Sequence, residues 1–222
     1  MKKILFTMLI SSICALSFAQ IDKEQFALDV SKADAANTEK LKAFIWKRHS
    51  TTTVNGEVKA TLVNEVSFNE KGEIQVTNID AETTVKNKRG IRGRIQDNKM
   101  EDNMDYVGKA LQMAIAYTYM SKGQLLDFFE KSTVTEKDGK VEVAGENILT
   151  EGDKLTVIID AATKLFIDKK FSSKLGEDPI DGEITYKEFS SGIVHGDETI
   201  LNLPGKNAVI NAKNQDYTQR IQ

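Results

Sequence analysis

The sequence predicts an α+β protein in which helices cover an antiparallel sheet. Segments with strand patterns come in two runs, residues 44–85 and 140–217, and a helical run lies between them. Turn dipeptides such as Asn55-Gly56 join neighbouring strands directly, as β-hairpins require. Segregated runs of strands and helices are typical of α+β folds, whereas a parallel sheet would need alternating strands and helices.

The first segment has the pattern of a secretory signal. Lys2 and Lys3 form a basic start, and residues 4–16 form an apolar stretch that is too short to cross a bilayer. Residues 17–19, Ser-Phe-Ala, supply small residues at the two positions that a signal peptidase recognises. We therefore predict cleavage after position 19, which leaves a single domain over residues 20–222.

Cys14 leaves a second kind of signal open, that of a lipoprotein. A small residue usually precedes a lipoprotein cysteine, and here Ile13 does, so the cleaved secretory signal is preferred. Because Cys14 is the only cysteine, the mature chain would contain no disulfide, no thiol nucleophile and no cysteine metal site. We expect the protein in the periplasm, or alternatively secreted or associated with the outer membrane.

The charge balance argues against nucleic acid as the main partner. The chain has 30 Lys+Arg and 33 Asp+Glu, a net charge of −3, and loss of the two signal lysines lowers this to −5. A chain of this charge lacks the basic surplus with which proteins neutralise phosphate backbones.

The elements are expected in the following order. Residues 22–36 have helical spacing with Asp22 as the N-cap, and a separate short turn reaches Leu41. A meander with one apolar face follows, then helices from about 95 to 131, then a second meander.

The most apolar stretch of the predicted mature chain is "ALQMAIAYTYM", residues 110–120, which carries no charge. It is far shorter than the roughly 20 residues that span a bilayer, so no transmembrane segment is expected after signal cleavage. A helix that is apolar nearly all round must be covered on several sides. We therefore expect it to lie in the concave face of a strongly curved antiparallel sheet, a half-open β-barrel that the N-terminal helix also covers.

No motif carries identifiable chemistry, so we expect no catalytic residues, no metal ligands and no cofactor. The only histidines are His49, in a predicted strand, and His195, near Ser190 and Asp197 in a polar turn. A Ser-His-Asp triad needs three groups that converge in space, which local crowding in a turn does not supply. We interpret His195 as a surface-loop histidine, and a hydrolase is the weakest hypothesis.

The sharpest charge cluster is "VKNKRGIRGR", residues 85–94. Two interpretations are open: a solvated connection between sheet and helix, or a patch that binds an anion or a lipid headgroup at a membrane surface. For the second, the candidate residues are Lys88, Arg89, Arg92 and Arg94.

The pattern as a whole resembles the LolA/LolB-like family of periplasmic lipoprotein carriers, and is nearer to uncharacterised exported proteins of that layout than to the carriers themselves. The segment "VIIDAATKLFIDKKFSS", residues 157–173, is similar to a strand–turn–strand of that fold, and residues 182–217 resemble its closing strands. The positions that carry the resemblance are Asp160, Thr163, Leu165, Tyr186, Pro204 and Tyr217.

The resemblance implies a concave face that shelters apolar groups. We expect an exported, non-enzymatic binding protein that holds a lipid, an acyl chain or a lipoprotein there. Trp46 can be ordinary core or cavity lining. The alternative is an envelope structural, protein-interaction or sensor domain whose core is filled. The candidate cavity-lining residues are Trp46, Phe68, Leu111, Ile115, Tyr119 and Phe128.

Overall fold

The computed structural model describes residues 21–83 and 91–220; for residue 83 and residues 91–104 it describes the backbone alone. The predicted signal with Cys14, and Lys88 and Arg89 of the basic cluster, lie outside the described residues. Within the described part of the chain, no helix is both long enough and apolar enough to span a membrane.

The strands form one ten-stranded antiparallel sheet in the order β3-β2-β1-β10-β9-β8-β7-β6-β5-β4. The first and last strands of the chain, β1 and β10, pair as the third and fourth strands of this order and join the two predicted meanders. The strands are β1 (Phe44–Val54), β2 (Glu57–Phe68), β3 (Ile74–Thr83), β4 (Thr133–Lys137), β5 (Lys140–Glu146), β6 (Lys154–Asp160), β7 (Phe166–Leu175), β8 (Asp178–Ser190), β9 (Ile193–Leu203) and β10 (Ala208–Gln219).

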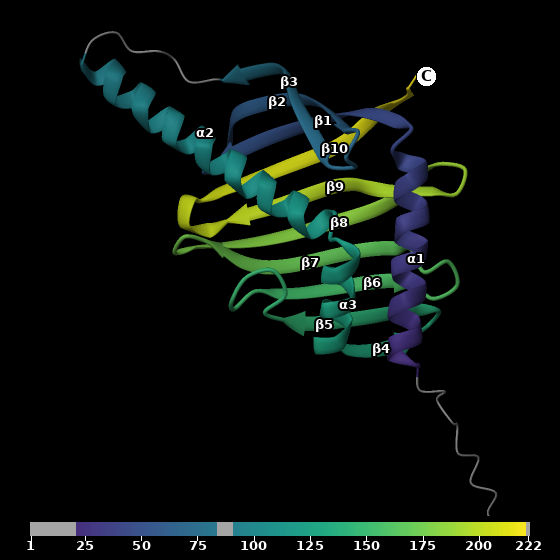
Figure 1. Ribbon diagram of the computed structural model, residues 1–222. Coiled ribbons are helices and arrows are strands. Elements are labelled where there is room, and N and C mark those ends of the chain that lie inside the picture. Colours follow the sequence, from purple (N-terminus) through teal and green to yellow (C-terminus); the bar gives the residue numbers. More distant parts are fainter. Residues whose placement is uncertain (1–20, 84–90, 221–222) are drawn as a thin grey trace, which may run out of the picture.

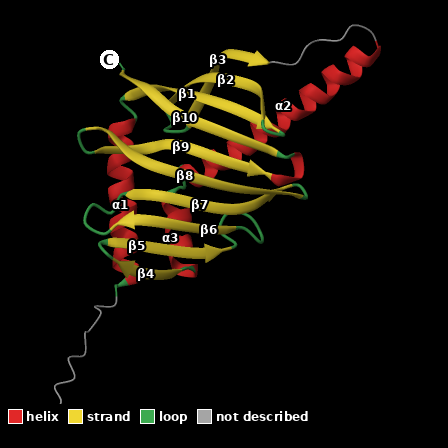
Figure 2. Cartoon of the chain, turned by 180° about the vertical axis from the view of Figure 1, so that it is seen from behind, coloured by secondary structure: helices red, strands yellow, loops and turns green. Residues whose placement is uncertain are grey.

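All three α-helices lie on one face of the sheet, which we call the inner face (Figure 1). They are α1 (Lys23–Leu41), α2 (Ile91–Thr118) and α3 (Lys122–Lys131), and a short 3-10 turn, η1 (Pro204–Lys206), joins β9 to β10. Helix α2 runs diagonally and ends over the middle of the sheet. Figure 2 shows that no described helix covers the opposite face. The α+β prediction and the placing of helices over one face are confirmed.

The expected half-open barrel is wrong. The sheet is neither closed nor strongly curled, and its two edge strands, β3 and β4, lie at opposite ends of the strand order (Figure 1). A barrel closes when its edge strands pair. Here the three helices occupy the inner face between the edges, and they bury the apolar side chains that closure would otherwise have buried.

Local sequence signals explain most boundaries. The side chain of Asp22 accepts a hydrogen bond from the N–H of Gln25, so the predicted N-cap of α1 is confirmed. Asn55 and Gly56 both have positive φ, as the predicted β1–β2 hairpin turn requires. The expected break in the first helix is wrong, because α1 continues to Leu41. The amide of Asn37 bonds the backbone of a strand instead of its own helix, so it does not interrupt α1.

The buried side chains form two clusters. The main core lies between the helices and the strands β5–β10, and includes Phe128 and Phe129 of α3. The second cluster lies under the upper end of α1 and the end of α2 (Figure 1). We call it the aromatic core: Leu41, Trp46, Val66, Phe68 and Ile193, with Phe44, Ile74, Tyr119, Phe189 and Tyr217 packed against them.

Candidate ligand-binding site

The end of α2 is fixed to the sheet by Tyr117. Its ring stacks on Phe171 of β7 with 4.1 Å between ring centroids, and its hydroxyl donates to Asp153 Oδ2 at 2.6 Å. The Asp153 carboxylate also accepts the backbone N–H groups of residues 148, 149 and 150. Burial alone would raise the pKa of Asp153, but these hydrogen bonds together lower it. The carboxylate therefore stays charged and holds the β5–β6 loop against α2.

Lys169 of β7 binds the C-terminal end of the same helix. Its buried ammonium donates to the carbonyl oxygens of Tyr117 at 3.1 Å and Thr118 at 3.0 Å, and lies 3.9 Å from the centre of the Phe166 ring. A cation at this end complements the helix dipole and supplies donors for carbonyls that the helix leaves free. Burial lowers the pKa of Lys169 to about 8, although the carboxylate of Asp34 acts in the opposite direction.

His195 lies inside the aromatic core. Its Nε2 is 2.5 Å from the hydroxyl oxygen of Tyr119, its Nδ1 is 2.7 Å from that of Tyr217, and its ring lies 4.6 Å from that of Trp46. Burial, helped by the charge of Arg48, lowers the pKa of His195 to about 3. The interpretation of His195 as a surface-loop histidine is wrong: it lies in β9, 3% exposed, and its polar partners are tyrosines.

Arg48 lies on β1 beside this histidine. It is buried, and its Nε donates to Asn214 Oδ1 at 3.1 Å, while the Asn214 amide donates to the carbonyl of Gly196. None of the ion pairs among the described side chains includes Arg48. A guanidinium carries five N–H donors, so most of its capacity is unused within the described part of the chain.

Beyond β1, toward β2 and β3, several apolar side chains on the inner face are less buried. Cross-strand partners share a face of the sheet, so Leu62 opposite Ser50, and Ala60 opposite Thr52, lie on the inner face of β2. Leu62 and Ala60 are half-buried, and Val76 of β3, which pairs with buried Val66 of the aromatic core, is 44% exposed. We call Ala60, Leu62 and Val76 the open strip.

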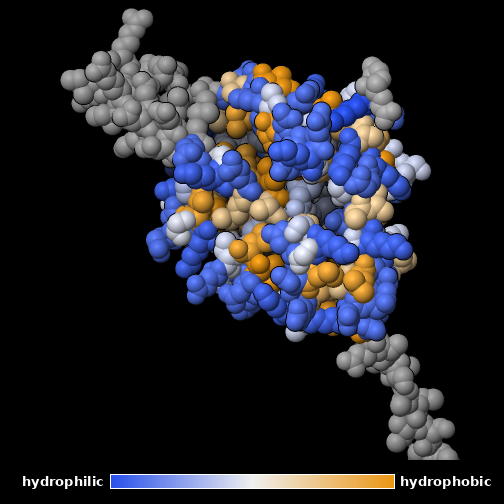
Figure 3. Space-filling model, viewed as in Figure 1, coloured by the Kyte–Doolittle hydropathy of each residue, from blue (hydrophilic) through white to orange (hydrophobic). Residues whose placement is uncertain are grey.

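The surface of the inner face shows the same change. Figure 3 shows apolar side chains gathered over β2 and β3, and a hollow between α1 and the end of α2. The open strip and the hollow both adjoin the aromatic core, which lies between them in the sheet.

The structure divides the predicted cavity-lining residues between the two clusters. Trp46, Phe68 and Tyr119 come together in the aromatic core, whereas Phe128 belongs to the main core and Leu111 packs against it. The sixth, Ile115, is half-buried on α2. Whether any of them contacts a ligand stays a prediction.

The predicted basic patch is described only in part. Arg92 and Arg94 lie in the first turns of α2, in the stretch where only the backbone is described. The patch therefore stays a prediction. Among the described residues, no group of three or more His, Cys, Asp or Glu side chains could hold a metal ion.

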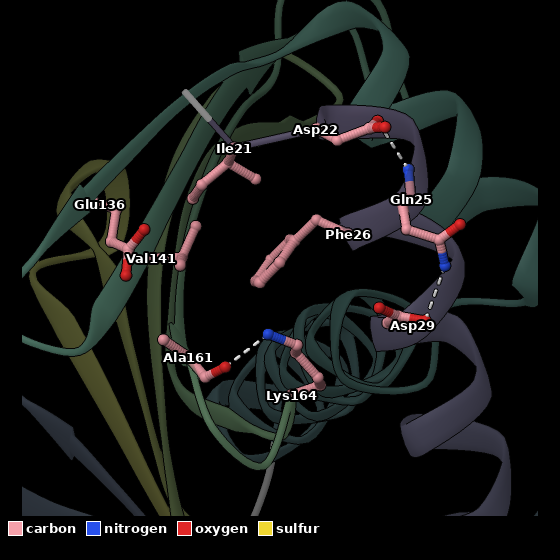
Figure 4. Close-up of a pocket in the computed structure, with 9 residues that line it drawn as sticks. All are labelled: Ile21, Asp22, Gln25, Phe26, Asp29, Glu136, Val141, Ala161 and Lys164. Atoms are coloured by element: carbon pink, nitrogen blue, oxygen red, sulfur yellow. Dashed lines mark hydrogen bonds between the residues drawn. The ribbon is translucent and has the colours of Figure 1, made fainter. Parts of the chain in front are cut away.

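A separate pocket of about 270 Å³ lies where the chain enters α1 (Figure 4). Phe26 and Val141 supply apolar walls, and Lys164, from the β6–β7 turn, points its ammonium over the Phe26 ring, 4.6 Å from the centroid. Gln25 links the acidic residues Asp22 and Asp29 on one side by hydrogen bonds. This pocket is small, mostly polar at its rim and remote from the aromatic core.

Comparisons with known proteins found structural likeness only. No family model and no curated protein matches this chain. Several solved structures align with it, and three of them, each at 9% sequence identity, are as follows. A DUF1329 family protein from Desulfovibrio piger has a TM-score of 0.43 and covers 90% of this chain and 95% of its own. A LolA superfamily protein from Nitrosomonas europaea has a TM-score of 0.39, with 88% and 94% covered.

The third is a putative outer membrane lipoprotein-sorting protein domain from Vibrio parahaemolyticus, with a TM-score of 0.41 and 90% and 94% covered. One of these three structures is thus a LolA superfamily protein, the family that the sequence resembles. Identities and TM-scores this low carry no information on function.

Sequence patterns missed the buried polar residues of the site. Arg48 alternates with Trp46, and His195 with Ile193, so regular alternation places both on the buried face and only their polarity suggests solvent. Lys169 lies three residues after Phe166, out of step with regular alternation. For Lys169 the reason is visible: a register shift between Ile158 and Ile159 of the partner strand makes β7 bury both Phe166 and Lys169. Only a signal for that bulge could have placed Lys169 inside.

Proposed function

We propose that this protein is a non-enzymatic, exported binding protein that holds an apolar chain, such as the acyl chain of a lipid or lipoprotein, against the open strip. The observation that supports the proposal is the half-buried apolar surface of Ala60, Leu62 and Val76 on the same face as a filled core. The domain that carries this activity would be residues 20–222.

The side chains beside the open strip are small, and Ala60 among them is only half-buried. Ser50 and Thr52 on β1, Ala60 on β2 and Ala212 on β10 are all small, and they occupy neighbouring inner-face positions. An extended hydrocarbon chain could lie over such a shallow surface beside α2. Each CH₂ removed from water contributes about 0.8 kcal/mol, from which the entropy of ordering the chain must be subtracted.

The contacts of His195 support a role without catalysis. Both of its ring nitrogens are engaged by tyrosine hydroxyls, and its lowered pKa leaves it neutral at physiological pH. A histidine general base works best with a pKa near the working pH, whereas the pKa of His195 is about 3. His195 therefore serves better as a packed element of the aromatic core than as a base.

Native mass spectrometry of the mature protein, purified from an envelope fraction, tests the proposal. We expect a stoichiometric adduct that organic solvent extracts and that is identified as a lipid or acylated species. A protein with no adduct that also fails to bind a fluorescent C16 fatty acid would contradict it.

Two adjacent residues of β2 provide a matched pair of variants. Leu62 belongs to the open strip on the inner face. Val63 lies on the other face of the sheet, where it pairs with His49 of β1, and its burial is similar to that of Leu62. We expect Leu62→Asn to weaken fatty-acid binding by about tenfold, the loss of one to two kcal/mol of apolar contact. Val63→Asn should leave the affinity within twofold, and equal losses in both variants would show that the chain does not lie on this face.

The alternative is a structural or protein-interaction domain with no ligand. The observation that favours it is the aromatic core itself, in which Trp46 and Phe68 fill the inner face near the ends of α1 and α2. In that case the open strip, next to edge strand β3, would contact another protein, and neither lipid adduct nor fatty-acid binding would be found.

A further inference from the structure

Arg48 is a buried cation without a counter-ion among the described side chains. It lies on β1, which has β10 on one side and β2 on the other, and is 8% exposed. Its one described hydrogen bond, from Nε to Asn214, uses a neutral amide oxygen. Removing a charge from water without a paired opposite charge costs several kcal/mol, so such a group is rarely kept without a use.

The neighbours of Arg48 on the same face are also polar groups without partners. Trp46 and Ser50 lie two residues before and after it, so all three point to the inner face. Trp46 Nε1 and Ser50 Oγ are enclosed and have no hydrogen-bond partner. The indole N–H can only donate, a guanidinium can only donate, and a serine hydroxyl donates readily. The inner face of β1 therefore presents a row of donors in which only Arg48 Nε has an acceptor among the described groups.

The groups around this row do not pair with Arg48. Asp34, whose charge, like that of Arg48, acts on Tyr119, forms no ion pair with it, and Asn64, opposite Arg48 on β2, forms no hydrogen bond with it among the described side chains. The Asn214 oxygen is used by Arg48 Nε, and the hydroxyls of Tyr119 and Tyr217 are engaged with His195. His195 itself is neutral, because burial and the charge of Arg48 lower its pKa to about 3. A ligand that fits must bring several acceptor oxygens and a negative charge.

We propose that Arg48, with Ser50 beside it, binds an oxyanion, a carboxylate or phosphate, and that this anion is the head of the apolar chain held on the open strip. The inference rests on the proposed function for the chain, and it adds the chemical class of the head. Arginine suits this task because its planar fork matches the oxygens of carboxylates and phosphates.

The arrangement of the two parts supports the pairing of head and chain. Ser50 of the donor row pairs across the sheet with Leu62 of the open strip. Directly opposite residues have Cβ atoms about 5 Å apart, so an anion at Ser50 and Arg48 would have its chain begin over Leu62. Figure 3 shows a hollow on this side of the molecule, between α1 and the end of α2.

Trp46 is the only tryptophan of the chain and reports on this site directly. The experiment titrates the mature protein with dodecanoate, dodecyl phosphate, dodecanol and dodecyltrimethylammonium below their micellar concentrations, and follows Trp46 emission. Inorganic phosphate and acetate serve as oxyanions without a chain. We expect both anionic amphiphiles to bind at least tenfold more tightly than the alcohol and the cation.

Three variants test whether Arg48 causes the preference for anionic amphiphiles. Arg48→Met keeps the length of the side chain and removes its charge, and we expect anionic and neutral amphiphiles to bind it with affinities within threefold of each other. Arg48→Lys keeps the charge, and should retain part of the preference even if Arg48→Met folds poorly. The control is Lys47→Met, an exposed cation next in sequence that pairs with Asp216, for which the preference should be unchanged.

The outcomes separate the two proposals. Equal binding of all four amphiphiles by the wild type would overturn the anion site and leave the proposed function standing. Binding of inorganic phosphate as tightly as dodecyl phosphate would support the anion site and contradict the chain. Loss of the preference in Lys47→Met as well would overturn the assignment to Arg48. No binding of any probe would overturn both.

Discussion

The two ends of the sheet are built from similar strands but differ in what covers them. At one end, the inner positions of β5 and β6 are fully buried under α1 and α3; they are Val141, Val143, Leu155, Val157 and Ile159. At the other end, Val66 and Phe68 of β2 are buried in the aromatic core, but Ala60 and Leu62 of β2 are half-buried and Val76 of β3 is exposed. Helix packing, rather than strand sequence, therefore decides which half is core and which half is surface.

The difference bears on function because a filled half can only stabilise, whereas an open half can also bind. Two of the enclosed polar atoms without a hydrogen-bond partner, Trp46 Nε1 and Ser50 Oγ, lie at the boundary on the inner face of β1. A boundary position gives Arg48 shelter from water on one side and access from the other, which is the environment in which a charge-assisted hydrogen bond to a ligand is strong.

The largest expected effect is in the covered half. Phe128 of α3 is 1% exposed in the main core. Phe128→Ala should lower the free energy of unfolding by about 3–5 kcal/mol, because it removes buried apolar surface and leaves a cavity. Urea unfolding followed by circular dichroism measures it. A loss below about 1 kcal/mol would mean that the helices do not hold a packed core.

A second effect concerns the carboxylate that holds α2. Asp153→Asn should cost about 2–3 kcal/mol at pH 7, because an amide replaces a charged acceptor of four hydrogen bonds. Since the pKa of Asp153 is lowered in the fold below its usual 3.8, its stabilisation is present above that pH and is lost as the pH falls further.

The measurement is the difference in unfolding free energy between wild type and Asp153→Asn from pH 7 to pH 2. It should stay constant down to about pH 4 and shrink below it. Asp127→Asn, an exposed acid of α3, is the control and should stay within about 0.5 kcal/mol of wild type at pH 7. A difference that grows on acidification would show that the carboxylate is not the stabilising form.

The smallest effect is expected in the open half. Ile79 of β3 is 51% exposed, so Ile79→Ala should change the unfolding free energy by less than about 0.5 kcal/mol. The same urea experiment compares it with Phe128→Ala. A loss similar to that of Phe128→Ala would erase the distinction between the halves, and would indicate that something covers β3 in solution.

The layout of elements could be predicted from the sequence, and the site could not. Alternation, Asn55-Gly56 and the apolar run at 110–120 place the hairpins and helices correctly, because these signals are local. The strongly curved sheet predicted from the sequence is wrong, because the curvature of the sheet depends on how the helices divide its inner face. The burial of Arg48 and His195 could not be predicted, because it comes from the docking of α2. That docking joins residues more than 70 positions apart, such as Tyr119 and His195.

The second half of helix α2 is attached to the sheet. Its last turn is fixed by Lys169, by the Tyr117–Asp153 hydrogen bond and by the ring of Phe171, and residues from Tyr106 to Ala114 pack on the main core. This supported stretch is about half of a helix that is 28 residues and about 42 Å long. Substitutions at Tyr117, Asp153 or Lys169 would therefore change the direction of the whole helix, including its distant first turns.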